Sequence, residues 1–243
     1  ILSNLPSDCR TLHSLPKLVE SDGYRTGVWP GESSPYVLLR GSWSDYFHKL
    51  SRNHRARVRK RLNKLEQLGK VGFEEISAPE AVAAALNDGF RIESAAWKKN
   101  SGTAILSQPE IERFYRLFAE QAANMGILRL LFLTLNGSRI AFSYALYRQQ
   151  RLYVLKSGYD PAFAQYSPSH LLCYFAIQGG FDHGMEEYDF LGNSEPWKID
   201  WAREIHAHSW LFIFSRGVRA KLLYKLKFHW IPLLQQLRKR FSK

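Results

Sequence analysis

Three consecutive runs in the middle of the chain are rich in apolar and aromatic residues and predict strands at residues 128–135, 139–147 and 152–159. In the second run the larger Ile140, Phe142, Tyr144 and Leu146 alternate with the smaller Ala141, Ser143 and Ala145, which is the two-residue period of a β-strand. Asn136-Gly137 separates the first two runs, and this dipeptide is the strongest short-range signal of a β-hairpin. The pattern therefore predicts an antiparallel three-stranded meander at the centre of the fold.

The third run opens a strand–helix–strand unit over residues 152–198. Ser167-Pro168 predicts the start of its helix, with serine as the N-cap and proline in the first helical position. The helix is expected to stop near Gly179-Gly180, before a short strand at 188–191. Such a crossover makes its two strands parallel and places a helix N-terminus beside a strand end, where an anion such as a pyrophosphate can bind.

The rest of the chain completes an α/β pattern. Apolar residues spaced by three and four predict helices at 43–68, 79–97 and 109–125. Shorter apolar runs predict strands at 35–39, 72–76 and 209–214. The resulting order β-α-α-β-β-β-α-β predicts an α/β fold with a mixed central sheet flanked by helices.

The net charge of +12 is concentrated in two segments of the 243-residue chain. Residues 49–70 hold nine Lys or Arg and one acid, and residues 216–243 hold nine Lys or Arg and no acid. The other residues are therefore net acidic, which is unlike a nucleic-acid-binding core. For the helix at 43–68 two interpretations stay open: a solvated charged face, or a surface that meets a phosphate-rich partner.

The last basic segment, residues 216–243, predicts a helix with one apolar face and a kink at Pro232. Such a helix is suited to lie on an anionic membrane with its apolar side down. The alternative is that the apolar face packs on another lobe or on the helix at 43–68. The chain has neither an apolar run long enough to span a bilayer nor a signal-like start, so we expect a cytoplasmic protein, peripheral at the inner face of the membrane if this helix binds it.

The cysteines and histidines indicate no metal centre. Cys9 and Cys173 lie far apart without a CxxC motif, so neither a disulfide framework nor a zinc site is expected. Cys173 falls in an apolar helix, which favours a buried thiol over a nucleophile. His206 and His208 alternate near a strand start and lack a third ligand.

Several motifs in sequence order resemble the GNAT-like acyltransferases associated with cellulose and exopolysaccharide synthesis, whose characteristic domain is called BioF2-like. They are Trp97-Lys98, 102–107, 152–160, Ser167-Pro168, 188–192 and 195–198. The same stretch is similar to the second lobe of Fem-type peptidyltransferases, which contain two tandem GNAT lobes. The resemblance implies four parts: the end of a truncated N-terminal lobe (1–40), a basic connector helix (41–70), a GNAT-like lobe (71–215) and a basic amphipathic helix (216–243). A start at Ile1 rather than Met fits a fragment or a processed form.

The resemblance also implies a reaction: acyl transfer from acyl-CoA, such as acetyl-CoA, to an amine or hydroxyl of a small or lipid-linked sugar precursor of the cell envelope or an exopolysaccharide. In the family the donor's pyrophosphate sits in a loop with the pattern Q/R-x-x-G-x-G/A. Residues 165–170 correspond to this pattern and Gln165 fits it, so the expected donor-binding residues are Gln165, Ser167, Ser169 and His170. Pro168 and His170 replace the glycines, and proline removes one backbone N–H donor.

Catalytic candidates lie at or near strand ends. Asp189 is a candidate base or a structural hydrogen-bonding residue, and Lys156 is a lone cation at the end of an apolar strand. Glu195 and Lys198 follow the strand at 188–191, where ligands of α/β sheets collect, and all four side chains are expected to converge on one cleft. The expected substrate-binding residues are Trp97, Lys98, Tyr159 and Lys198.

Two other functions remain open. A Fem-type aminoacyltransferase, whose donor is aminoacyl-tRNA, would make use of the basic connector and tolerate the missing glycines. A catalytically inactive GNAT-like lobe would instead bind partners in a polysaccharide-synthesis assembly. If the chain is an enzyme, we expect direct attack of the acceptor on the thioester, because no activated Ser or Cys is evident.

Overall fold

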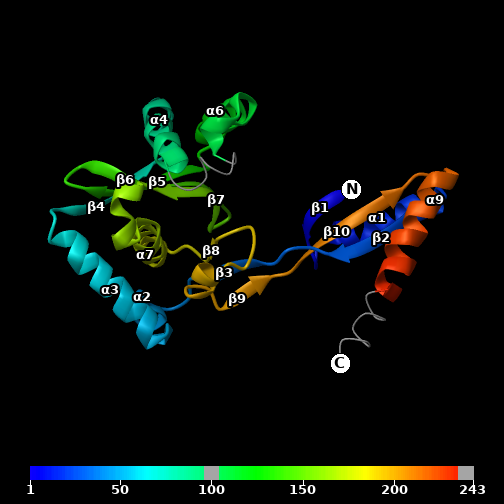
Figure 1. The fold of residues 1–243 in the computed structure, drawn as a ribbon, viewed down its shortest axis with the longest axis horizontal. Coiled ribbons are helices and arrows are strands. Elements are labelled where there is room, and N and C mark those ends of the chain that lie inside the picture. The colour runs from blue at the N-terminus through cyan, green and yellow to red at the C-terminus, as the bar shows by residue number, and fades with distance from the viewer. Residues whose placement is uncertain (96–103, 235–243) are drawn as a thin grey trace. The chain divides into compact units, whose positions relative to one another are not determined.

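The computed structural model describes residues 1–95 and 104–234, which form two compact units (Figure 1). The smaller unit comprises residues 1–34, 192–194 and 205–243, and the larger one residues 35–191 and 195–204. The boundaries predicted from the sequence (1–40, 41–70, 71–215 and 216–243) follow chain order and stay predictions. Each unit has its own sheet.

The larger unit is built on a mixed sheet in which the strands follow one another in the order β4-β5-β6-β7-β8-β3. These strands are β3 (Ser34–Leu38), β4 (Val71–Ile76), β5 (Leu128–Leu135), β6 (Ser138–Arg148), β7 (Arg151–Tyr159) and β8 (Glu187–Asp189), and the short strand β9 (Glu204–His206) begins at the last residue of this unit. From β4 to β3 every pair is antiparallel except β7 with β8. The predicted α/β class, the meander and the parallel crossover are confirmed.

Asn136-Gly137 forms the predicted hairpin turn between β5 and β6. Both residues have positive φ, 50° and 80°, as a turn that matches the twist of its strands requires. The Asn136 side chain also accepts a hydrogen bond from the Lys70 N–H at 2.8 Å and donates one to the Leu68 carbonyl at 3.3 Å. The hairpin therefore anchors the chain that leads into β4.

Helices cover both faces of this sheet (Figure 1). On one face lie α4 (Pro79–Ala95) and α6 (Pro109–Asn124), and on the other α2 (Trp43–Lys49), α3 (Arg52–Glu66) and α7 (Pro168–Asp182). Successive β5 side chains alternate between two cores: Leu130 and Phe132 pack with α4 and α6, whereas Leu131 and Leu133 pack with α7. This two-sided burial explains why β5 is apolar at almost every position.

The single helix expected at 43–68 is wrong, because the structure breaks it into α2 and α3. Leu50 is extended, and Ser51 caps α3 by accepting a hydrogen bond from the His54 N–H at 3.2 Å. A serine hydroxyl competes for helical N–H groups, which favours a new N-terminus over an uninterrupted helix. The break sets the direction of α3 independently of α2.

The helix expected to stop at Gly179-Gly180 instead continues as α7 to Asp182. A Cβ on Gly180 would lie 2.8 Å from the Leu39 Cδ1 atom. The glycine is needed for close packing of the helix on the chain after β3, and it does not end the helix.

The smaller unit contains a three-stranded antiparallel sheet of order β1-β10-β2. Its elements are β1 (Leu2–Pro6), α1 (Arg10–Ser21), β2 (Arg25–Pro30), β10 (His208–Phe214) and α9 (Val218–Lys225), which continues into a π-helical turn η3 (Leu226–Trp230). The strand expected at 209–214 therefore exists, but it pairs with β1 and β2. Sequence reasoning missed α1, which contains Pro16, the largely exposed β1 and the half-buried β2.

Replacing Ser51 tests the helix break. Ser51→Ala removes the cap of α3 and should lower the free energy of unfolding by about 1 kcal/mol, the usual value of an N-cap. Ser51→Asp keeps an acceptor for the His54 N–H and should retain the stability of the unchanged chain. Chemical denaturation followed by circular dichroism measures both; equal stability of the alanine and aspartate variants would contradict the capping role.

Candidate functional site

The parallel strands β7 and β8 are neighbours, as predicted, but they pair over three residues only. Arg151, Leu152 and Tyr153 face Glu187, Tyr188 and Asp189 in register. β8 then ends at Asp189, whereas β7 continues to Tyr159. The second half of β7 therefore runs on without β8 beside it, which opens the sheet at the carboxyl ends of these strands.

A β-bulge marks the point where β7 leaves β8. Val154 pairs with Ala145 and Lys156 with Tyr144, so Leu155 is an extra residue with no partner on β6. Bulges bend a strand and redirect its side chains, and they are frequent beside active sites. Here the bulge brings Lys156 to the α6 face of the sheet, where its ammonium lies 5.8 Å from the centre of the Tyr115 ring.

A buried acid lies on the same face and was missed by sequence reasoning. Glu93 of α4 is fully buried, and its Oε2 accepts a hydrogen bond from the Ile105 N–H at 3.0 Å. Gly158 permits the close approach of β7 to this residue, because a Cβ there would lie 2.6 Å from the Glu93 Cα. Burial and, secondarily, the Glu93 charge raise the pKa of Tyr115. In the sequence, the signal that could have indicated this buried acid is its position next to Ile92 in a helix that is otherwise rich in apolar residues.

Asp189, Glu195 and Lys198 come together around one backbone position. Asp189 accepts a hydrogen bond from the Leu191 N–H at 2.8 Å, and the Lys198 ammonium donates to the Leu191 carbonyl at 2.9 Å. Leu191 has φ 50°, a left-handed conformation that a leucine rarely adopts, so these contacts offset its strain. Glu195 lies 3.5 Å from the Lys198 ammonium.

Lys156 does not share these contacts; its ring neighbour is Tyr115. Tyr159 packs with the core on the opposite, α7 face of the sheet. Trp97 and Lys98 lie outside the described residues. The structure therefore gathers three of the four residues expected to converge, and the catalytic roles of Asp189, Lys156 and Glu195 stay predictions.

The segment expected to hold the donor pyrophosphate differs from its prediction in one respect. Pro168 is the first residue of α7, but the Ser167 side chain makes no capping bond, because Ser167 itself is left-handed with φ 49°. Its carbonyl instead accepts the His170 and Leu171 N–H groups at 3.0 and 3.3 Å. With proline lacking an N–H, the first turn of α7 keeps few donors for an anion. Gln165 is exposed, and Ser169 is half-buried.

His170 is not placed as a charged anion donor. Its ring lies 6.4 Å from that of His54 on α3, and its Nδ1 is buried without a hydrogen-bond partner among the described residues. Burial, followed by the positive charge of Arg61, lowers the pKa of His170 to about 4. Burial also lowers the pKa of His54, whose Nδ1 lies 3.6 Å from Asp200. Both rings are therefore neutral at pH 7.

Cations of α3 supply the positive charge near the start of α7. Arg57 forms a 2.9 Å ion pair with Asp200. Burial and the neighbouring Arg57 lower the pKa of Arg61, and its charge in turn acts on His170 in the first turn of α7. An anion placed here would relieve the repulsion between the two guanidinium groups.

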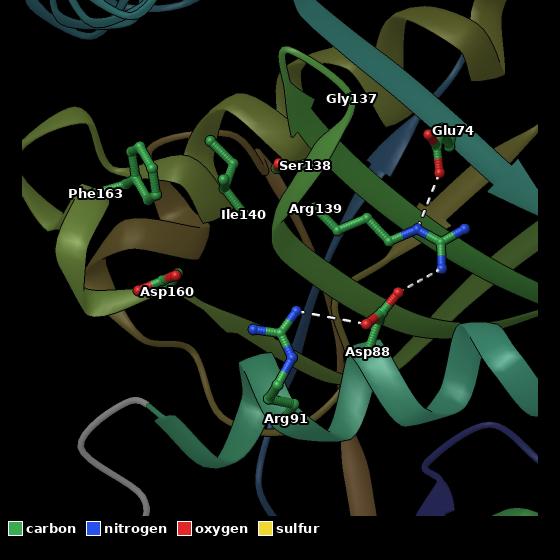
Figure 2. A pocket seen from close by; sticks show the side chains of 9 residues that line it. All are labelled: Glu74, Asp88, Arg91, Gly137, Ser138, Arg139, Ile140, Asp160 and Phe163. Carbon is green, nitrogen blue, oxygen red and sulfur yellow. Dashed lines mark hydrogen bonds and ion pairs between the residues drawn. The ribbon is translucent and has the colours of Figure 1, made fainter.

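A separate cavity of about 510 Å³ opens near the far end of β7 (Figure 2). Arg139 crosses it and bonds to Glu74 at 3.0 Å and to Asp88 at 3.1 Å, with its guanidinium 4.2 Å from the centre of the Phe132 ring. Two carboxylates thus already neutralise this arginine, which favours a structural network over an anion site. Of the predicted catalytic, donor-binding and substrate-binding residues that the structure describes, none lines this cavity.

Cys173 is the buried thiol that the sequence predicted. Its side chain is 5% exposed, and burial raises its pKa to about 12. The Tyr188 hydroxyl is its hydrogen-bond partner at 3.7 Å. A thiol with so little thiolate at neutral pH is a poor nucleophile.

Comparison with known proteins identifies the family. The sequence model of the acetyltransferase (GNAT) domain matches residues 52–199, which include α3, the splayed strands and α7. The chain belongs to the GNAT acetyltransferase family. A search of curated proteins found no match.

Solved structures share the GNAT fold at low sequence identity. FemX is 11% identical with a TM-score of 0.59, over 92% of this chain and 72% of FemX. The C-terminal domain of a putative lysylphosphatidylglycerol synthetase from Agrobacterium fabrum is 13% identical with a TM-score of 0.53, over 87% and 69% of the two chains. L-PGS from Bacillus licheniformis is 13% identical with a TM-score of 0.50, over 88% and 70%. At these identities the likeness shows the fold alone.

The lowered pKa of His170 predicts a pH-dependent stability. The folded-state pKa of His170 lies below the ordinary value of 6.5, so stability is full above pH 6.5 and falls as the pH drops toward 4. This one group can account for up to roughly 3 kcal/mol. His170→Gln should flatten the fall in urea unfolding measured across this range, whereas His183→Gln, at an exposed position after α7, should not. An equally steep fall in His170→Gln would contradict the assignment.

Proposed function

We propose that this GNAT domain transfers an acyl group from acyl-CoA to an amine or hydroxyl of a cell-envelope or exopolysaccharide precursor. The observation that carries the proposal is the splay of β7 from β8 next to the Leu155 bulge, inside the region that matches the family. The class of acceptor rests on the resemblance of residues 97–198 to the exopolysaccharide-associated acyltransferases. The donor lies in the splay, against the start of α7.

The chemistry follows from residues at the bulge. The acceptor attacks the thioester carbonyl carbon and the carbon–sulfur bond breaks. The acceptor loses a proton in this reaction, and the leaving thiolate gains one. The backbone N–H of Leu155, the bulged residue without a paired residue on β6, is the candidate donor to the developing oxyanion. Tyr115, whose raised pKa keeps it protonated, can supply the proton to the thiolate and then regain the proton that the acceptor has lost.

Glu93 is the carboxylate best placed to receive the acceptor's proton, directly or through a water. It is buried beside β7, close to Gly158, and its backbone partner fixes its orientation. Lys156 lies on the same face and adds positive charge beside Tyr115. Asp189 remains a second candidate base, although its contact with the Leu191 N–H already gives it a structural role.

The donor's phosphates meet α3 cations as well as α7. Pro168 and the bonded N–H groups of His170 and Leu171 leave the first turn of α7 poor in donors. Arg57 and Arg61 lie near this turn, and guanidinium groups bind phosphate oxygens in a bidentate manner. This arrangement supports the interpretation of the basic segment as a phosphate-facing surface.

The alternative is an aminoacyltransferase that uses aminoacyl-tRNA. The small number of free N–H groups at the start of α7 favours this alternative. The pyrophosphate of CoA depends on such N–H groups more than the end of a tRNA does. The basic exposed face of α3 would then contact the tRNA backbone. Titration of the chain with acetyl-CoA and with aminoacyl-tRNA separates the two donors, and binding of neither would favour a non-catalytic lobe.

Arg61 tests the donor seat. Arg61→Gln should weaken binding of whichever phosphate-bearing donor binds by about tenfold, since a charge-assisted contact is lost. Lys64→Gln on the exposed part of the same helix is the matched control and should bind as the unchanged chain does. Isothermal titration calorimetry measures the affinity of both variants for the donor, and equal affinities would contradict the proposed contact between Arg61 and the donor's phosphates.

Glu93 tests the chemistry. Glu93→Gln keeps the size and the acceptor oxygen but removes the base, so turnover should fall about a hundredfold with unchanged donor affinity. The assay is thiol release from acetyl-CoA in the presence of a panel of amino sugars. Glu110→Gln, at an exposed position on α6, should retain turnover. A Glu93→Gln protein with full turnover would exclude Glu93 as the base.

A further inference from the structure

The C-terminal helix of the smaller unit uses one side to pack on its own sheet. Phe228 lies with its ring 5.8 Å from Phe212 and 5.9 Å from Trp29, and Tyr224 stacks beside it at 5.5 Å. A Cβ on Gly27 would overlap the Phe228 ring, so glycine makes room for this contact. Figure 1 shows α9 alongside β2 and β10. The rotation of the helix about its axis is therefore fixed.

A second apolar stripe on this helix is left in water. Val218, Leu222, Leu226 and Trp230 follow one another at intervals of four residues and are 82%, 69%, 50% and 59% exposed. More apolar side chains beside this stripe are also exposed: Leu223, Leu233 and Leu234. Since Tyr224 and Phe228 already dock the helix, its packing in the smaller unit does not use this stripe.

The charge around the stripe is of one sign. Residues 216–234 carry five Lys or Arg and no acid. Arg216 and Lys227 lie over aromatic rings of the smaller unit, within 4.9 Å of Tyr24 and 4.1 Å of Phe212. Arg219, Lys221 and Lys225 are exposed, so the stripe is bordered by cations without a carboxylate on the same helix. Such a surface is complementary to an anionic one.

We propose that residues 218–234 bind the surface of an anionic lipid bilayer, with the stripe inserted at headgroup depth. Exposed leucines and a tryptophan gain free energy by entering the interface, and flanking cations meet the lipid phosphates. Nucleic acid would satisfy the cations but leave the leucines in water. No helix in the described part of the chain is long and apolar enough to cross a membrane, so the proposed binding is along the surface.

The π-helical turn supports this geometry. Residues Leu226–Trp230 form a wider turn than an α-helix does, and such a turn shifts the positions that follow relative to those before it. Across this turn Phe228 still reaches the sheet while Leu226 and Trp230 stay exposed. The helix can thus hold its docked face and present the stripe at the same time.

The test is co-sedimentation of the full chain with vesicles of phosphatidylcholine, with or without phosphatidylglycerol. The unchanged chain should bind the phosphatidylglycerol vesicles, and Leu222→Ser with Leu226→Ser should lower binding by about tenfold or more. Arg219→Gln with Lys225→Gln should lower it by a similar factor and reduce its sensitivity to salt. Both pairs are exposed, so thermal unfolding should be unchanged.

Leu18→Ser is the matched control, because Leu18 is 65% exposed in the same unit but lies on α1. This variant should bind vesicles as well as the unchanged chain. Equal binding by the Leu222/Leu226 variant would overturn the proposal, as would equal binding to vesicles without phosphatidylglycerol. Binding of bulk RNA by the unchanged chain without binding of anionic vesicles would overturn it as well.

Discussion

The candidate site depends on the short parallel contact between β7 and β8. Three residue pairs hold the strands together, and beyond them the sheet opens. The contact exists because α7 carries the chain back across the sheet, and it ends because Leu191 turns out of β8 in a left-handed conformation. Asp189 and Lys198 each bind one peptide group of Leu191, so two charged side chains stabilise the point where the strands part.

The face of the sheet under α4 and α6 is shaped by two local departures from regular structure. The Leu155 bulge redirects β7, and Gly158 lets α4 approach it closely enough to place Glu93 against the strand. An acid with no exposed surface is costly to bury, and the hydrogen bond that it accepts from the Ile105 N–H offsets part of that cost. Functional sites commonly contain residues that reduce stability in this way.

The opposite face is governed by electrostatics between α3 and α7. Two arginines, the buried His54 and the half-buried His170 share this region, and the structure accommodates them by keeping the histidines neutral and pairing Arg57 with Asp200. The remaining positive charge sits next to a helix start that offers few N–H groups. An anionic donor would therefore account for both features: it would neutralise the cations of α3, and these cations would replace the N–H groups that a helix start with Pro168 lacks.

The sequence by itself determined the meander, the crossover, the two-sided burial of the sheet and the basic helix that begins at Val218, because these follow from local periodicity and turn chemistry. It did not determine the break at Ser51, since a hydroxyl can cap a helix or point into solvent with the same local pattern. The pairing of β10 with β1 and β2 and the approach of Glu93 to Gly158 join residues far apart in sequence, and no local pattern encodes such contacts. Only the tertiary structure decided that Lys156 lies beside Tyr115 while Asp189 and Lys198 hold Leu191, because a single bulged residue changes the face to which every later side chain points.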